Sequence, residues 1–141
     1  MTREEIVKLF DRRHDAYARL DAEALAADHA EDGVLESPTA GGTVYGREAI
    51  AKIYRGWFAG FPDVSMDWND LMIDGDSVVQ MATASGTDTG GFMGLPPTGK
   101  GFLFPIVFMF TLKDGRIAHE RRIYDFTGML VQIGVLKAKP V

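Results

Sequence analysis

The fold is decided by residues 102–126, which read FLFPIVFMFTLKDGRIAHERRIYDF. Two extended, apolar-rich runs, Phe102–Leu112 and Ile117–Phe126, flank Lys113-Asp-Gly115. An Asp-Gly turn between two such runs is typical of a β-hairpin. This part of the chain is therefore predicted to form two long antiparallel strands.

A second hairpin is predicted just upstream. Val64–Ile73 and Ser77–Ser85 flank Asp74-Gly75-Asp76, which repeats the pattern of an extended run, a tight turn and an extended run. No linker-like stretch separates this hairpin from the helical sequence before it. The chain is therefore expected to form a single domain over residues 1–141.

The N-terminal third of the chain has helical periodicity. Thr2-Arg-Glu-Glu5 has the spacing of a capping box and predicts a helix to about Leu20, while Asp21 can cap a second helix from Ala22 to about Glu31. A third helix after Gly46 is predicted from an apolar stripe at Ile50, Ile53, Tyr54, Trp57 and Phe58. Three helices packed on one face of a curved, mostly antiparallel sheet make an α+β fold.

Composition excludes several classes of function. The chain has 141 residues, a net charge of −5 and 46% hydrophobic residues, so one core is expected and no positive field exists to attract nucleic acid. The longest uncharged run, Gly101–Leu112, is too short to span a membrane, and the first residues lack the apolar region of a signal peptide. A cytoplasmic protein with no membrane or nucleic-acid partner is therefore expected.

Cysteine and histidine usage restricts the chemistry further. The chain has no Cys, which excludes disulfides, zinc-thiolate sites and Cys nucleophiles. His14, His29 and His119 are scattered without ligand spacing, so no metal site is predicted. Any catalysis must then come from carboxylates, His, Arg, Tyr or Ser/Thr.

The segment between the two hairpins, residues 86–101, carries six Gly and two Pro. Such a connection can form a rim or lid over a cavity, or an extended excursion that contributes to dimer contacts. Gly94–Gly101 partly matches a phosphate-binding loop, but Pro96 and Pro97 lack the N–H groups that such a loop needs. Asp88-Thr-Gly90 resembles the triplet of aspartic proteases, yet only one copy exists.

The last predicted strand carries a polar row. Alternation of side chains predicts one face formed by Ile117, His119, Arg121, Ile123 and Asp125, beside a row of the preceding strand formed by Phe104, Ile106, Phe108 and Phe110. If both rows line the concave side of the sheet, ionisable groups lie in an aromatic cavity, where burial makes a carboxyl group a better general acid or base. Asp125 is then the best candidate, and its alternative role is a salt bridge or a cap on the C-terminal segment. Glu120 and Arg122 fall on the other face, where they are expected to serve the surface or a dimer interface.

Other polar and aromatic residues could also reach such a cavity. His14 lies on the apolar stripe of the first helix and is either a cavity residue or a hydrogen-bonded core histidine. Tyr17 and Trp57 are core residues that could contact a ligand. Glu36, on a short strand over Val34–Ser37, faces either the cavity or solvent.

Short motifs are spread over nearly the full length of the chain. They are Asp21-Ala-Glu-Ala-Leu25, Gly46-Arg-Glu-Ala-Ile50, Phe61-Pro-Asp63, Gly94-Leu-Pro-Pro-Thr98, Asp114-Gly-Arg-Ile117, Tyr124-Asp125 and Gln132-Ile-Gly134. In their order and spacing they resemble the SnoaL-like polyketide cyclase family of the nuclear transport factor 2-like superfamily. The resemblance implies a cone of three N-terminal helices and a curved sheet around a deep pocket. It also implies a homodimer formed through the outer face of the sheet, and no metal or organic cofactor.

The resemblance also implies roles for individual residues. In the characterised cyclases a carboxylate at the position of Asp125 is the general acid/base of an aldol ring closure. Arg121 or His119 would here donate to the enolate oxygen. The cyclases place polar groups near Asp88, Ile106 and Phe108, two of which are apolar in this chain.

The same superfamily includes two other chemistries. The ketosteroid isomerase pattern, a base just before a Pro on the first strand, is not met, because Ser37 precedes Pro38. Epoxide hydrolysis needs an Asp–Arg–Asp set, for which Asp88, Arg121 and Asp125 are the right residue types.

These observations predict an enzyme that performs aldol cyclisation, isomerisation or hydrolysis on a hydrophobic, carbonyl-bearing small molecule. Asp125, Arg121 and His119 are the expected catalytic residues. The expected substrate-binding residues are His14, Tyr17, Glu36, Trp57, Asp88, Phe104, Ile106 and Phe108. The alternative is a non-catalytic binding or accessory protein of the same fold.

Overall fold

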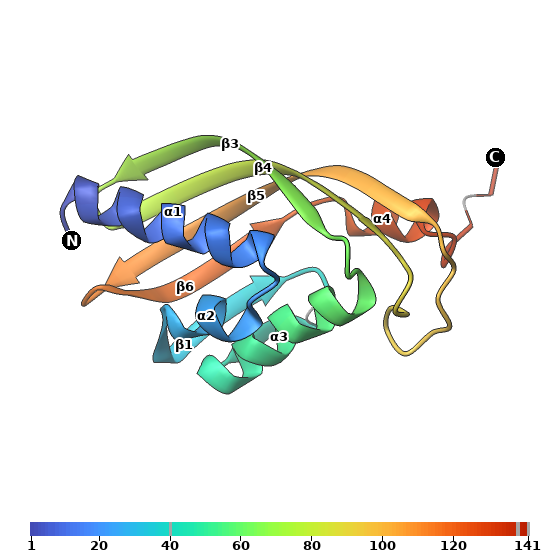
Figure 1. Ribbon diagram of the computed structural model, residues 1–141, viewed down its shortest axis with the longest axis horizontal. Coiled ribbons are helices and arrows are strands. Elements are labelled where there is room, and N and C mark those ends of the chain that lie inside the picture. Colours follow the sequence, from blue (N-terminus) through green and yellow to red (C-terminus); the bar gives the residue numbers. More distant parts are fainter. Residues whose placement is uncertain (40, 138, 141) are drawn as a thin grey trace.

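The computed structural model describes residues 1–39, 41–137 and 139–140, which form four helices and six strands (Figure 1). In chain order these are α1 (Arg3–Ala18), α2 (Ala22–Ala27), β1 (His29–Ser37), β2 (Gly42–Tyr45), α3 (Arg47–Gly60), β3 (Ser65–Asp74), β4 (Ser77–Thr87), β5 (Gly101–Lys113), β6 (Arg116–Ile123) and α4 (Phe126–Gln132).

The first and third predicted helices are confirmed. At the start of α1, the Thr2 hydroxyl accepts the Glu5 N–H at 3.1 Å and the Glu5 carboxylate accepts the Thr2 N–H at 3.0 Å, which completes the capping box. The apolar stripe of α3 buries Ile50 and Tyr54 against the sheet. Both helices therefore form where their capping and periodicity indicate.

The second helix is shorter than predicted. It ends at Ala27 instead of near Glu31, because the backbone from His29 onward pairs with β6. The Ile117 N–H donates to the Asp28 carbonyl at 2.9 Å and draws the chain into the sheet at that point. Strand pairing thus overrides the helical propensity of this segment.

The six strands form one curved sheet in the order β2-β1-β6-β5-β4-β3. Every neighbouring pair is antiparallel except β1 and β6, which are parallel. Helices α1, α2 and α3 lie against the same face, and α4 lies at the opposite end of the sheet from the N-terminus (Figure 1). The predicted α+β class, with three N-terminal helices on a mostly antiparallel sheet, is confirmed.

A β-bulge in β6 determines which side chains face inward. Leu112 of β5 pairs with Ile117, but the next residue, Thr111, pairs with His119, so Ala118 is an extra residue. An extra residue exchanges the two faces of the strand beyond it. Inward-facing positions after the bulge are therefore Glu120, Arg122 and, just past the strand, Tyr124, all of which are buried.

Candidate functional site: an aromatic pocket with a buried arginine

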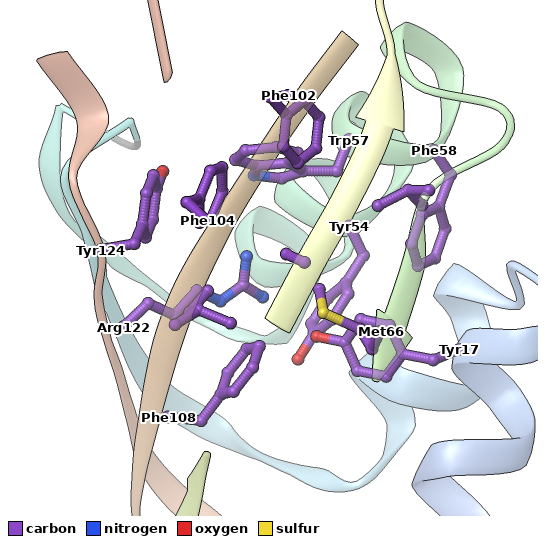
Figure 2. A pocket seen from close by; sticks show the side chains of 13 residues that line it. Tyr17, Tyr54, Trp57, Phe58, Met66, Phe102, Phe104, Phe108, Arg122 and Tyr124 are labelled. Carbon is purple, nitrogen blue, oxygen red and sulfur yellow. The ribbon is translucent and has the colours of Figure 1, made fainter. Parts of the chain in front are cut away.

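An apolar pocket lies between the concave face of the sheet and helices α1 and α3 (Figure 2). The space open to the centre of a water molecule is about 20 Å³, enough for roughly one water. The side chains thus nearly fill the cone. They are Tyr17, Tyr54, Trp57, Phe58, Val64, Met66, Ala84, Phe102, Phe104, Ile106, Phe108, Arg122 and Tyr124.

Several residues predicted from sequence to bind a substrate contribute to this lining. The structure places Tyr17, Trp57, Phe104, Ile106 and Phe108 around the pocket. The β5 residues reach it because their strand alternates regularly, with every second side chain facing inward. Their role in binding remains a prediction.

Three aromatic rings form a parallel stack along one wall. The centroids of Phe102 and Phe104 are 4.9 Å apart at 19°, and those of Phe104 and Tyr124 are 5.0 Å apart at 12°. Trp57 from α3 meets the outer rings of this stack at steep angles, 71° to Phe102 and 77° to Tyr124. Such a wall offers both flat faces and ring edges to a planar apolar group.

Arg122 brings a charge into this aromatic space. Figure 2 shows its guanidinium among the aromatic rings, where it lies 4.7 Å from the ring centroid of Tyr54 and 5.8 Å from that of Phe108. Nε donates to the Glu120 carboxylate at 2.6 Å. Nη2 is buried and has no hydrogen-bond partner among the described residues. The lining of the pocket therefore includes a guanidinium group with unused hydrogen-bonding capacity.

Glu120 anchors Arg122 from behind the pocket. It is fully buried, and its Oε1 accepts the Tyr54 hydroxyl at 2.6 Å and lies 2.8 Å from His29 Nε2 and 3.7 Å from Arg13 Nη2. Burial alone would raise the pKa of Glu120, but the charge of Arg122 and the contacts of His29 and Arg13 outweigh it and hold this pKa well below its usual range. Glu120 is thus an ionised structural partner, not a proton acceptor for a ligand.

The predicted inward face of β6 was wrong, and the bulge at Ala118 is the reason. Arg121 and His119 lie on the outer side, where Glu36 is 3.7 Å from Arg121 Nε and 3.1 Å from His119 Nε2. None of these three side chains lines the aromatic pocket. Glu120 and Arg122, which were expected outside, point inward instead.

Asp125 is exposed and lies outside the pocket lining. Its carboxylate accepts the Gly128 N–H at 2.8 Å and caps the N-terminus of α4. This is the capping role considered from sequence as the alternative to catalysis. The sequence prediction that Asp125 faces the cavity is therefore corrected.

His14 lies on the helical side of the core but outside the pocket lining. Its ring stacks on Trp68 with centroids 4.1 Å apart, and its Nε2 is 3.0 Å from the Gln80 side-chain oxygen. Burial lowers the pKa of His14. This matches the hydrogen-bonded core histidine of the sequence interpretation.

Asp88 holds the connection between β4 and β5 and does not line the pocket. It is fully buried, and its carboxylate accepts N–H groups from Gly91 and Thr98, each at 3.1 Å, and the Thr98 hydroxyl at 3.1 Å. The backbone of the connection also packs tightly on α3: a Cβ added to Gly90 would lie 1.8 Å from the Ala59 carbonyl oxygen. Asp88 therefore shapes a fixed loop.

The same connection packs against Trp57, a residue of the pocket lining. Phe92 is buried, and its ring centroid lies 5.6 Å from that of Trp57 and 5.2 Å from that of Phe61. The rim interpretation of residues 86–101 is thus supported by packing on the pocket residue Trp57.

A larger, open depression adjoins the pocket on the side of β1 and β6. Its volume, in the same measure, is about 360 Å³, and it shares Arg122 and Tyr124 with the lining of the pocket. The Tyr124 hydroxyl donates to Thr39 Oγ1 at 2.9 Å and lies 3.4 Å from Ser37 Oγ. Tyr124 therefore lies between the enclosed aromatic pocket and the open depression.

Within residues 1–39, 41–137 and 139–140, no group of three or more His, Asp and Glu side chains is arranged to hold a metal ion. In the part of the chain that the structure describes, no helix has both the length and the apolar character needed to cross a bilayer.

Helices on the concave face of a mixed, curved sheet, with an aromatic pocket between the layers, define the nuclear transport factor 2-like class of α+β proteins. The family model of the SnoaL-like polyketide cyclases matches residues 8–133. The chain therefore belongs to the SnoaL-like polyketide cyclase family.

Solved structures support this assignment. IdmH from Streptomyces antibioticus, whose proposed activity is polyketide cyclisation, is 31% identical with a TM-score of 0.71, over 93% of this chain and 96% of IdmH. TsrD from Streptomyces laurentii is 26% identical with a TM-score of 0.82, over 96% of this chain and 99% of TsrD. AclR from Streptomyces galilaeus is 24% identical with a TM-score of 0.82, over 99% of this chain and 91% of AclR. At this identity the likeness supports only the fold. A comparison with curated protein sequences gives no match.

Proposed function

We propose that this chain is an enzyme that performs acid–base chemistry on an apolar, carbonyl-bearing small molecule, with Arg122 binding the carbonyl oxygen. One observation carries the proposal. Arg122 lines an aromatic pocket, and its buried Nη2 has no hydrogen-bond partner among the described residues. A donor fixed in a poorly solvated site stabilises the negative charge that develops on oxygen when a neighbouring C–H is deprotonated. The proposed activity of IdmH belongs to this class of chemistry.

The other ionisable groups of the lining are hydroxyl donors. Burial raises the pKa of Tyr17, Tyr54 and Tyr124, so these side chains stay protonated at neutral pH. Among the described residues, no carboxylate lines the pocket. The proton of the C–H group is therefore taken up by water or buffer, and the proposal assigns the rate enhancement to stabilisation of the enolate oxygen by Arg122. It favours substrates whose own C–H groups are acidic, such as 1,3-dicarbonyl compounds.

Deuterium exchange tests this proposal without knowledge of the natural substrate. The protein is incubated in deuterated buffer with a panel of aromatic ketones and 1,3-dicarbonyl compounds, and incorporation at the carbon beside the carbonyl is followed by NMR. We expect acceleration by the wild type and a loss of about 10² to 10³ in rate for Arg122→Met, the usual effect of removing one oxyanion donor.

Two further variants make the result interpretable. Arg122→Lys keeps the charge and reports on the site if Arg122→Met does not fold. Arg3→Met removes an exposed guanidinium from α1 and should exchange at the wild-type rate. A folded Arg122→Met variant with wild-type exchange would exclude the proposed role.

The small volume of the closed pocket and the lack of a carboxylate in its described lining favour a second candidate, a non-catalytic binding protein. Mass spectrometry of the purified protein distinguishes the two functions. A binding protein should retain a co-purifying apolar ligand and release it chemically unchanged. An enzyme should convert that molecule or a close analogue of it.

A further inference from the structure

The buried polar cluster behind the pocket has an uneven charge balance. His29 is fully buried and both of its ring nitrogens face oxygen atoms: Nδ1 lies 3.0 Å from the Leu25 carbonyl and Nε2 lies 2.8 Å from Glu120 Oε1. The same carboxylate also faces two guanidinium groups, since Arg13 Nη2 lies 3.7 Å from Oε1 and Arg122 Nε lies 2.6 Å from Oε2. Glu120 is therefore shared among three nitrogen-bearing side chains.

The remaining buried charges are two guanidinium groups. Arg13 Nη1 lies 3.2 Å from Asp28 Oδ2, but Asp28 also pairs with Arg12, and Arg13 contacts Glu120 as well. Arg122 contacts only Glu120 among the described carboxylates. Because Arg122 shares this single carboxylate with Arg13, its charge is the surplus.

Arg122 brings this surplus charge into the lining of the pocket. Its side chain is 6% exposed, and its Nη2 is buried without a hydrogen-bond partner among the described residues. A buried cation without a full counter-charge is costly, and an anion placed beside it recovers that cost. The same donor stabilises a neutral carbonyl much less.

We propose that the pocket binds its ligand as an oxygen anion: an acidic enol or phenol on a planar apolar framework loses its proton to solvent on binding, and its oxyanion pairs with Arg122. The inference deepens the proposed function, since it uses the same Arg122 site, but it concerns the charge state of the bound molecule and not its turnover.

The framework of such a ligand fits the walls. The parallel rings of Phe104 and Tyr124 offer faces for stacking at one side of the pocket. The closed pocket has room for about one water, so a ring must enter by displacing a lining side chain. Tyr124, which borders both the pocket and the open depression, is the side chain whose movement would join them.

The titratable groups around Arg122 determine how ligand binding depends on pH. Titratable groups reach it from three elements: Glu120 of β6, Tyr17 of α1 and Tyr54 of α3, with Tyr124 at the end of β6. His29 of β1 and Arg13 of α1 contact Glu120 behind it. The lining from β3, β4 and β5 is apolar, formed by Met66, Ala84, Phe102, Phe104, Ile106 and Phe108. The tyrosines stay protonated, so the ligand is the group that changes its charge.

A chromogenic phenol tests the proposal. 4-Nitrophenol is titrated with the full-length protein at a pH below the pKa of the free probe, and the visible absorbance of the phenolate is recorded. We expect absorbance to rise on binding, because an opposite charge at this distance lowers the pKa of the bound phenol by about 1 to 3 pH units. 4-Nitroanisole, the methyl ether of this probe, keeps the aromatic ring but has no ionisable group and should bind more weakly, by at least about tenfold.

Variants separate the pocket from adventitious surface binding. Arg122→Met should abolish the rise in absorbance, whereas Arg3→Met, which removes an exposed charge, should retain it. If Arg122→Met fails to fold, the comparison of the two probes on the wild type decides the question.

Several results would overturn the proposal. These are binding of 4-nitrophenol in its neutral form, equal affinity for both probes, no binding of either probe, or an unchanged signal in folded Arg122→Met. Failure of the proposed function is recognised separately, because 4-nitrophenol has no C–H group that takes part in the exchange assay.

Discussion

Glu120 is the residue on which the buried cluster depends. It receives contacts from Arg122, His29, Tyr54 and Arg13 and is fully buried. Removing its charge leaves two guanidinium groups without their shared partner, a change that usually costs about 3 to 5 kcal/mol. Glu120→Gln is therefore expected to lower the free energy of unfolding by this amount in urea denaturation. The exposed Glu31→Gln should have no measurable effect.

Glu120 should also contribute to the pH dependence of the free energy of unfolding. The pKa of Glu120 in the folded chain lies below its ordinary value of 4.5. Above that value the carboxyl group is ionised in both states and its stabilisation is complete. As the pH falls below it, the unfolded chain takes up the proton first, so stability decreases. Denaturation midpoints between about pH 5 and pH 3 should fall more steeply for the wild type than for Glu120→Gln; parallel slopes would contradict this role.

At the scale of single elements, the sequence predicts most of the framework. Local sequence patterns are enough to predict α1, α3 and both hairpins, because capping, helical spacing and Asp-Gly turns act within a few residues. The aromatic face of β5 follows from regular alternation. The end of α2 was predicted too late in the chain. The segment after Ala27 forms a strand instead, because His29 pairs with Ile117, and this contact joins residues far apart in the chain.

The polar part of the site could not be derived from the sequence. Strict alternation along β6 placed Arg122 outside, and only the pairing of β5 with β6 reveals the extra residue at Ala118. The sequence does contain one hint of an inward Glu120 and Arg122. These two residues carry opposite charges and lie two positions apart, so they share one face of the strand and can form an ion pair. Alternation alone, however, does not indicate that such a pair faces the interior.

The short helix α4 provides a test of the role of Asp125. Asp125→Ala removes the cap on α4 and should destabilise the protein by about 0.5 to 2 kcal/mol, whereas Asp125→Asn, another good N-cap residue, should change stability little. Urea denaturation of the three proteins measures this. A catalytic carboxylate would behave differently: Asp125→Asn would then lose about two to four orders of magnitude in the deuterium-exchange assay with stability intact.

At the scale of the whole molecule, the face of the sheet that is turned away from α1, α2 and α3 carries exposed apolar side chains (Figure 1). Met81, Val107 and Ile123 form a row across β4, β5 and β6, and Met109 lies beside it. Met81 is 37%, Met109 39% and Ile123 48% exposed, which makes an apolar patch of the kind that marks protein interfaces. We propose that two copies of the chain pair through this face.

Size-exclusion chromatography with light scattering tests the proposed homodimer. The wild type should elute as a dimer, and Met109→Lys, which places a charge in the patch, should elute as a monomer. Met93→Lys is the matched control, because Met93 is 61% exposed on the connection between β4 and β5. A monomeric wild type would exclude the homodimer.

The bulge at Ala118 holds one residue more than regular pairing with β5 requires. Deleting Ala118 would leave Ile117, Glu120 and Arg122 on the same face in regular alternation, so the pocket and the outer face would keep their side chains. A one-residue deletion at Arg121, with the bulge still in place, would instead turn Arg122 outward. The length of the strand should therefore be tolerant to change at the bulge and strictly constrained beyond it.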